Sequence, residues 1–173
     1  MNSQLDSQLQ ELLDKKACEE LVVRYGRTQD WLDTPGQNSC FWPDAEIDFG
    51  FFKGDGENWV KTVMPHEQAA LRRWHMSTSV IIQVDGDKAT GECYGIAVGT
   101  HLNENGEKED NMYGGRYLDE FERRHGEWRI SKRTYVLDWG TQFPNALVDL
   151  TPEDFALNIL EIDKPGHPEY RAL

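Results

Sequence analysis

The sequence predicts a single α+β domain in which helices come first and a curved antiparallel sheet follows them. Apolar residues recur at three- and four-residue steps early in the chain, and they alternate with polar residues beyond His75. A chain of 173 residues is long enough to bury a core and still leave an internal cavity. We therefore expect residues 1–140 to form one domain whose helices pack against the sheet and enclose a pocket, with residues 141–173 as a C-terminal extension.

The first half of the chain predicts two helical regions separated by a short strand. Residues from Ser3 to Leu32 follow an amphipathic helical pattern, and the Thr34–Gly36 segment is expected to end it. The aromatic-rich stretch from Phe41 to Phe52 alternates in part, which favours a strand. A second helix is expected from Trp59 to Trp74, bent or split at Pro65.

Beyond His75 the pattern indicates four long strands joined by hairpins. Asp85–Asp87 is a hairpin signal, Asn103–Asp110 is a hydrophilic turn and His125–Glu127 is a tight turn. One face of the second long strand carries only small residues, which leaves space above it. A ligand, or close packing by a helix or a neighbouring subunit, could fill that space equally well. These small residues are Gly91, Cys93, Gly95, Ala97 and Gly99.

Composition and charge exclude several classes of partner and cofactor. The formal net charge of −13, without a basic stripe, argues against nucleic acid. Cys18, Cys40 and Cys93 are too widely spaced for a zinc motif or a small disulfide framework, so we expect reduced thiols in a cytoplasmic protein. No signal peptide or membrane-spanning stretch is expected, and neither a metal nor another cofactor.

The C-terminal extension has less regular sequence. Thr151–Asp154 is typical of a helix start, and the tail from Lys164 is rich in proline and charge. We interpret residues 141–173 as a surface arm or a lid over the pocket rather than a second domain.

Asp30 and His75 are the strongest candidates for chemistry, because a carboxylate and an imidazole can move a proton without metal or nucleotide. A curved sheet could bring the end of the first helix and the start of the first long strand together. In that arrangement His75 would act as a base, with its second nitrogen held by Asp30. The alternatives are a strand-end histidine bonded to backbone and a carboxylate on a solvated helix face, with Asp33 serving in a cap or loop.

Several local patterns together resemble the SnoaL-like group of the nuclear transport factor 2-like superfamily. They cover roughly residues 8–139 in the family's order, and jointly they are far more specific than any one of them. They are Arg24–Asp33, Trp42–Ala45, His75–Val80, Gly115–Asp119 and Arg123–Arg133. The resemblance implies a cone-shaped α+β barrel whose open end holds a hydrophobic ligand.

The resemblance also implies roles for individual residues. Asp30 and His75 match the aspartate and histidine of the family's dehydratases and dehydrochlorinase, Tyr25 matches a pocket tyrosine, and Arg133 matches a pocket arginine. The second histidine of scytalone dehydratase has no counterpart, since His101 is expected too near the Asn103 turn.

Tyr25 and Arg133 also have structural alternatives. The tyrosine could donate to a developing oxyanion or pack in the core. The arginine could stabilise a leaving group or form a cross-strand ion pair. Several aromatic side chains could line the pocket or belong to the core; these are Trp42, Phe49, Tyr113, Tyr117 and Trp139.

The resulting hypothesis is a cofactor-independent lyase acting on a small, apolar cyclic or aromatic compound, through loss of water, halide or formaldehyde. An isomerase or cyclase using the same dyad, and a non-catalytic binding or assembly subunit, are the alternatives. By analogy with the family, we expect a homodimer or homotrimer.

Overall fold

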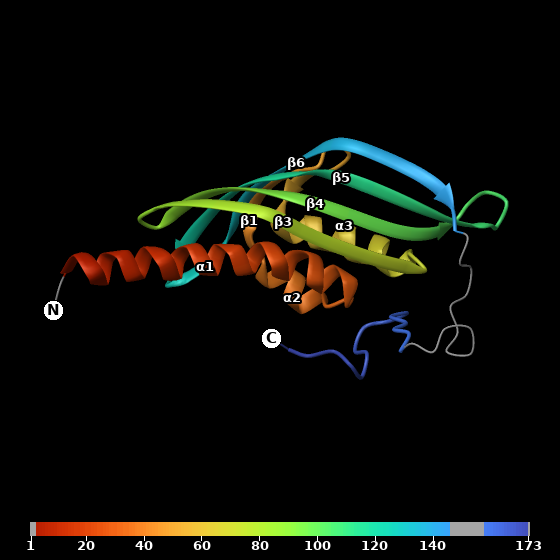
Figure 1. The fold of residues 1–173 in the computed structure, drawn as a ribbon, viewed down its shortest axis with the longest axis horizontal. Helices are drawn as coiled ribbons and strands as arrows, with labels where there is room; N and C mark the ends of the chain where they lie inside the picture. The colour runs from red at the N-terminus through yellow and green to blue at the C-terminus, as the bar shows by residue number, and fades with distance from the viewer. Residues whose placement is uncertain (1–2, 146–157, 173) are drawn as a thin grey trace.

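A computed structural model describes residues 3–145 and 158–172, and it shows one curled, unclosed six-stranded sheet with helices against it (Figure 1). The strands lie in the order β2-β1-β6-β5-β4-β3. The elements in chain order are α1 (Ser3–Asp30), α2 (Thr34–Ser39), β1 (Phe41–Asp48), β2 (Lys53–Asp55), α3 (Gly56–Ala69), β3 (Arg72–Asp85), β4 (Lys88–Leu102), β5 (Lys108–Arg124) and β6 (Glu127–Pro144). This architecture confirms the predicted α+β class.

The four long strands β3 to β6 form the antiparallel meander that the alternating pattern predicts. Gly86 and His125–Gly126 occupy the hairpin turns with positive φ, a conformation that glycine adopts without strain. The sheet is not wholly antiparallel, however, because β1 pairs in parallel with β6. This parallel pair brings the first strand to the end of the meander and leaves β2 and β3 as the edges of the sheet.

The helices differ from the expected pattern at their ends. Helix α1 ends at Asp30, and Leu32 turns the chain with a φ of 55°. Asp33 then accepts a hydrogen bond from the Gly36 N–H at 2.9 Å, so the segment expected only to stop one helix also begins another. The expected role of Asp33 in a cap is therefore found.

The second predicted helix is shorter than expected. Helix α3 ends at Ala69, so Trp74 belongs to β3 and not to the helix. Pro65 lies inside α3, which continues through it as one element. The three-residue strand β2 (Lys53–Asp55) was not predicted, because the strand expected in this region ended at Phe52.

The core lies between α1, α3 and the concave face of the sheet. Cys18, Leu21, Val22 and Tyr25 line one face of α1 and are buried there. Part of the space above the small-residue face of β4 is filled within the chain, because a Cβ at Gly95 would lie 2.5 Å from the Tyr117 ring.

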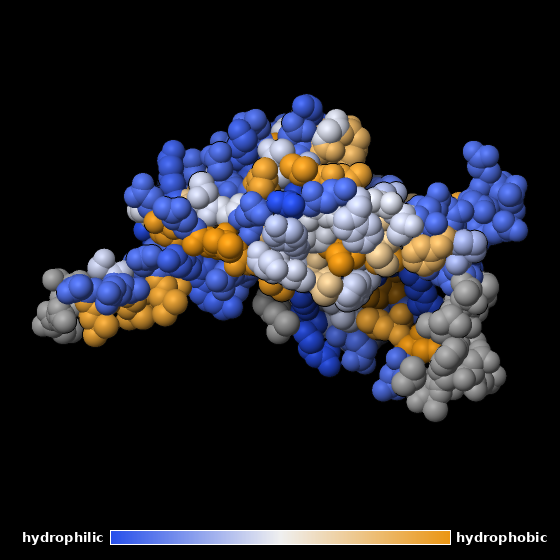
Figure 2. Space-filling view, turned by 45° about the horizontal axis from the view of Figure 1, so that its top comes forward, coloured by the Kyte–Doolittle hydropathy of each residue, from blue (hydrophilic) through white to orange (hydrophobic). Residues whose placement is uncertain are grey.

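The first turns of α1 extend beyond the sheet, and Figures 1 and 2 show this end projecting from the body. Its apolar side chains, Leu5, Leu9, Leu12 and Leu13, are exposed. The space-filling view shows them as a hydrophobic strip on the projecting end (Figure 2).

The three cysteines are free and buried, which agrees with the expectation of reduced thiols. None of the described helices is long and apolar enough to span a bilayer. The helix predicted to start at Thr151 lies outside the described residues.

Candidate active site

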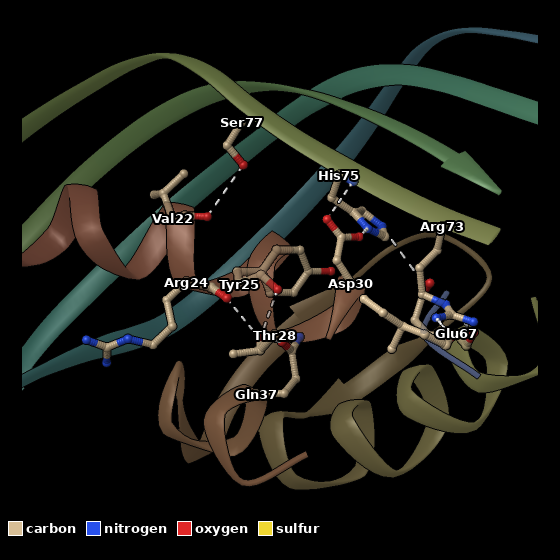
Figure 3. Close-up of polar contacts among 11 residues, drawn as sticks. Val22, Arg24, Tyr25, Thr28, Asp30, Gln37, Glu67, Arg73, His75 and Ser77 are labelled. Carbon is tan, nitrogen blue, oxygen red and sulfur yellow. Dashed lines mark hydrogen bonds and ion pairs between the residues drawn. The ribbon is translucent and has the colours of Figure 1, made fainter. Parts of the chain in front are cut away.

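Asp30 and His75 are in direct contact where the end of α1 meets the start of β3 (Figure 3). The Nδ1 atom of His75 lies 2.7 Å from Oδ1 of Asp30, and the His75 backbone N–H donates to Oδ2 at 3.1 Å. Both carboxylate oxygens are therefore engaged by one residue. Gly26 allows this approach, since a Cβ there would lie 3.0 Å from Cβ of His75. The two side chains keep only 19% and 11% of their surface exposed.

The surroundings of His75 favour its protonated form. Burial by itself lowers the pKa of His75, but the hydrogen bond to Asp30 and the charges of Glu67 and Asp30 outweigh it. Arg73 opposes them weakly, and the pKa of His75 lies above its ordinary value of 6.5. Because Nδ1 is bound to the carboxylate, Nε2 is the nitrogen that remains for proton exchange.

His75 faces a cavity of about 280 Å³ between α3 and the sheet. Its walls combine small apolar groups from β4 with polar groups from α3, β4 and β5. The lining residues are His66, Glu67, Ala70, His75, Ala97, Val98, Gly99, His101, Asn111 and Tyr113. A second hollow of about 160 Å³ is lined by Asp30 and His75 together with Arg27 and Trp31. His75 therefore lines both hollows, and Asp30 lines the smaller one.

Four polar residues that line the larger cavity were not among the predicted site residues: His66, Glu67, His101 and Asn111. His101 was expected to lie too near the turn, but β4 continues to Leu102 and places His101 in the same cavity as His75. Burial and the neighbouring His66 lower the pKa of His101. Spacing could have revealed His101, because it lies on the same strand face as Ala97 and Gly99.

Glu67 was missed for a different reason. It lies in the last turn of α3, with one carboxylate oxygen 3.9 Å from Nε2 of His75. Helical spacing groups Glu67 with Ala70 on one face of the expected helix. Nothing in the sequence indicates which strand that face meets. Arg73 fixes this helix end by donating to the carbonyl oxygens of Glu67 and Ala70.

Tyr25 and Arg133 lie next to each other but away from both hollows described above. Arg133 is fully buried and makes two hydrogen bonds to Asp119, at 2.7 and 2.6 Å. Its guanidinium is stacked between the rings of Tyr25 and Tyr117, at 4.2 and 4.4 Å from their centroids. Burial raises the pKa of Tyr25, which keeps its hydroxyl protonated. The geometry matches the structural alternative for each residue, because Arg133 forms a cross-strand ion pair and Tyr25 packs in the core.

Of the five candidate aromatic residues, Tyr113 lines the cavity that His75 faces. Phe49 stacks on Trp59 at 4.0 Å, and Tyr117 joins the same buried group of rings. Trp42 donates to the carbonyl of Glu122, and Trp139 covers Gly114 on the sheet surface. Neither of these two tryptophans lines either hollow.

The described part of the C-terminal extension contacts residues close to Asp30 and His75 in the sequence. The rings of His167 and Tyr170 contact Trp31, which lines the smaller hollow. The carbonyl of Ile162 accepts a hydrogen bond from Arg73 at 2.8 Å. The extension is therefore attached to the two elements that carry the pair.

Within the described residues, no group of three or more histidine, cysteine, aspartate or glutamate side chains could hold a metal ion. The three histidines and one glutamate around the larger cavity do not form such a group.

A model of the SnoaL-like domain matches residues 10–134. No curated protein matches the sequence. Among solved structures, the hexachlorocyclohexane dehydrochlorinase LinA-type3 from Novosphingobium barchaimii is 24% identical, with a TM-score of 0.67 over 84% of this chain and 99% of that chain.

Two further solved structures have the same fold. A putative scytalone dehydratase from Novosphingobium aromaticivorans is 20% identical, with a TM-score of 0.66 over 75% of this chain and 87% of its own. A Mycobacterium tuberculosis protein of unknown function is 27% identical, with a TM-score of 0.60 over 78% of this chain and 75% of its own.

Proposed function

The chain belongs to the SnoaL-like domain family, and we propose that it is a cofactor-independent lyase in which His75 is the general base. The dehydratase and dehydrochlorinase among the similar structures support an elimination reaction. The observation that carries the proposal is the cavity-facing imidazole whose Nδ1 is held by Asp30. In this arrangement the lone pair of Nε2 is available to a molecule bound in the cavity.

The mechanism follows from the two nitrogens of His75. With Nδ1–H donating to Asp30, the neutral ring has an unprotonated Nε2 that can remove a proton from a carbon of the substrate. The imidazolium that forms is stabilised by the Asp30 carboxylate, which is 2.7 Å away. Departure of a group from the neighbouring carbon then completes the double bond, and no bound electron acceptor is required.

The cavity suits a small, largely apolar ring compound. Ala70, Ala97, Val98 and Tyr113 supply apolar wall, and a volume of about 280 Å³ lies near the small end of ordinary ligand sites. Ala97 and Gly99, at the end of the small-residue face of β4, line the cavity, and this supports a ligand as the occupant of that part of the space.

Three cyclic ketones test the proposal directly. 3-Hydroxycyclohexanone loses water, 3-chlorocyclohexanone loses chloride, and 2-(hydroxymethyl)cyclohexanone loses formaldehyde by retro-aldol cleavage. We expect the protein to accelerate at least one of these reactions. His75→Ala should lower that acceleration by about 100-fold or more, the usual contribution of a positioned base. Product formation is followed by ultraviolet absorbance of the enone or by formaldehyde assay.

The control is His125→Asn, which replaces a histidine in the exposed β5–β6 turn at a φ of 56° that asparagine tolerates. It should retain wild-type rates. Equal rates for wild-type protein and a folded His75→Ala variant, shown by matching circular dichroism spectra, would disprove the role of His75.

A further inference from the structure

Glu67 places a second carboxylate on the cavity side of His75. Its side chain is 12% exposed, and its Oε1 lies 3.9 Å from Nε2 of His75 (Figure 3). No hydrogen bond to this carboxylate is found among the described residues. The nearby Arg73 donates to backbone carbonyl oxygens instead. A charged group thus lines the cavity beside the proposed base with its hydrogen-bonding capacity free.

The gap between Glu67 and His75 has the size of one bridging oxygen atom. Two hydrogen bonds of roughly 2.8 Å each that meet at one oxygen, at an angle of about 90°, span a separation of 3.9 Å. The carboxylate of Glu67 can only accept, so the bridging group must donate a hydrogen to it. A hydroxyl donates to Glu67, and its lone pairs accept a hydrogen bond from Nε2 once that nitrogen carries a proton, whereas a halogen substituent has no hydrogen to donate.

Charge also separates the possible leaving groups. A departing halide is an anion, and the carboxylates of Glu67 and Asp30 lie on both sides of His75. A buried carboxylate disfavours a second negative charge beside it. A hydroxyl that leaves as neutral water, after receiving a proton, creates no such charge.

We propose that Glu67 and Nε2 of His75 together bind the leaving hydroxyl of the substrate, so that the cavity takes cyclic β-hydroxy carbonyl compounds and not halides. This inference rests on the proposed function, and it favours a hydroxylated substrate over a halide. Glu67 is then a catalytic residue that contacts the substrate.

The proton balance closes without another reactant. The neutral Nε2 removes the proton on the carbon next to the carbonyl group, and the electrons of that C–H bond form the carbon–carbon double bond. The C–O bond breaks as Nε2–H returns the same proton to the hydroxyl oxygen, and water leaves. Glu67 accepts a hydrogen bond from the hydroxyl throughout and ends the cycle in its starting ionisation state.

The experiment compares Glu67→Gln with Glu57→Gln, the same change at an exposed position on α3 where Glu57 pairs with Lys61. The matched substrates are 3-hydroxycyclohexanone and 3-chlorocyclohexanone, which give the same enone. We expect Glu67→Gln to lower the acceleration of dehydration about 10- to 100-fold, as for loss of a charged hydrogen bond. The wild type should accelerate chloride elimination little or not at all, and Glu57→Gln should behave as the wild type. Acceleration of chloride elimination equal to that of dehydration, or no loss of dehydration in Glu67→Gln, would overturn the inference.

A second measurement needs no turnover. Cyclohexanol and chlorocyclohexane are titrated into the protein, and the imidazole signals of His75 are followed by nuclear magnetic resonance. Cyclohexanol should shift them in the wild type and much less in Glu67→Gln, while chlorocyclohexane should have little effect. Equal responses to the two ligands, or none to cyclohexanol, would contradict the inference. By contrast, a Glu67-dependent response to cyclohexanol combined with His75→Ala rates equal to wild type would refute the proposed function alone.

A pH titration of the same imidazole signals, without added ligand, reports the electrostatic contact between His75 and Glu67. Glu67→Gln removes a charge that raises the pKa of His75, so the pKa should fall, whereas Glu57→Gln should leave it unchanged. An unchanged pKa in Glu67→Gln would also overturn the inference. The other titratable or charged groups near this imidazole are Arg27, Asp30, His66, Arg73, His101 and Tyr113.

Discussion

Two pairs of carboxylate and basic side chains lie in the interior of this domain, and they differ in what surrounds the basic partner. Arg133 and Asp119 are 0% and 2% exposed, and the guanidinium lies between two tyrosine rings. His75 and Asp30 are also mostly buried, but the imidazole faces a cavity and keeps Nε2 for another partner. The first pair has the geometry of a structural ion pair, and the second has that of a site for proton transfer.

The two pairs also differ in how they respond to pH. Arg133 stays protonated throughout the physiological range. His75 is charged only below its pKa, which lies above 6.5 in the folded protein. The stabilisation from this raised pKa is therefore complete below the unfolded pKa of about 6.5 and is lost as the pH rises through the folded value. A titrating pair can exchange a proton during a reaction, whereas a permanently charged pair cannot.

Asp119→Asn gives the largest expected effect on stability. It leaves the Arg133 guanidinium buried without its counter-charge, which typically costs about 3–5 kcal/mol of the free energy of unfolding. Asp138→Asn is the control, because Asp138 pairs with Arg116 at the surface, where such pairs contribute about 1 kcal/mol or less. Urea denaturation of both variants measures the difference. Similar losses would show that burial does not distinguish the two pairs.

Asp30→Asn should act on turnover more than on folding. The amide cannot stabilise the imidazolium, so we expect the rate to fall about 100-fold. The pKa of His75 should also fall, because both the hydrogen bond and the charge of Asp30 raise it. A general base works when unprotonated, so the wild-type rate should rise with pH through a value above 6.5. In the variant this rise should move to lower pH. An identical pH profile in the wild type and the variant would show that Asp30 does not act on His75 during the reaction.

The sequence predicted the meander from local patterns, because alternation and turn signals define hairpins. The Asp30–His75 contact joins elements far apart in the chain, and its prediction depended on the family resemblance. The family resemblance was needed to choose Asp30 over Asp33, since helical spacing alone places both near the end of α1.

Other parts of the site depend on packing that spacing does not encode. Glu67 reaches His75 because the last turn of α3 meets the first residues of β3. The helix was expected to continue to Trp74, so the sequence did not place its end beside His75. Arg133 was expected either in the pocket or in an ion pair. Its position opposite Asp119 in the β5–β6 register decides the geometry in favour of the pair. Strand register is a tertiary property, and the sequence left both alternatives open.

The most direct measurement is the protonation of His75 followed by nitrogen magnetic resonance as a function of pH. The account predicts a pKa above 6.5 and, at higher pH, a neutral ring with the hydrogen on Nδ1 and a free Nε2. A neutral ring with its hydrogen on Nε2, or a pKa at or below 6.5, would contradict the account.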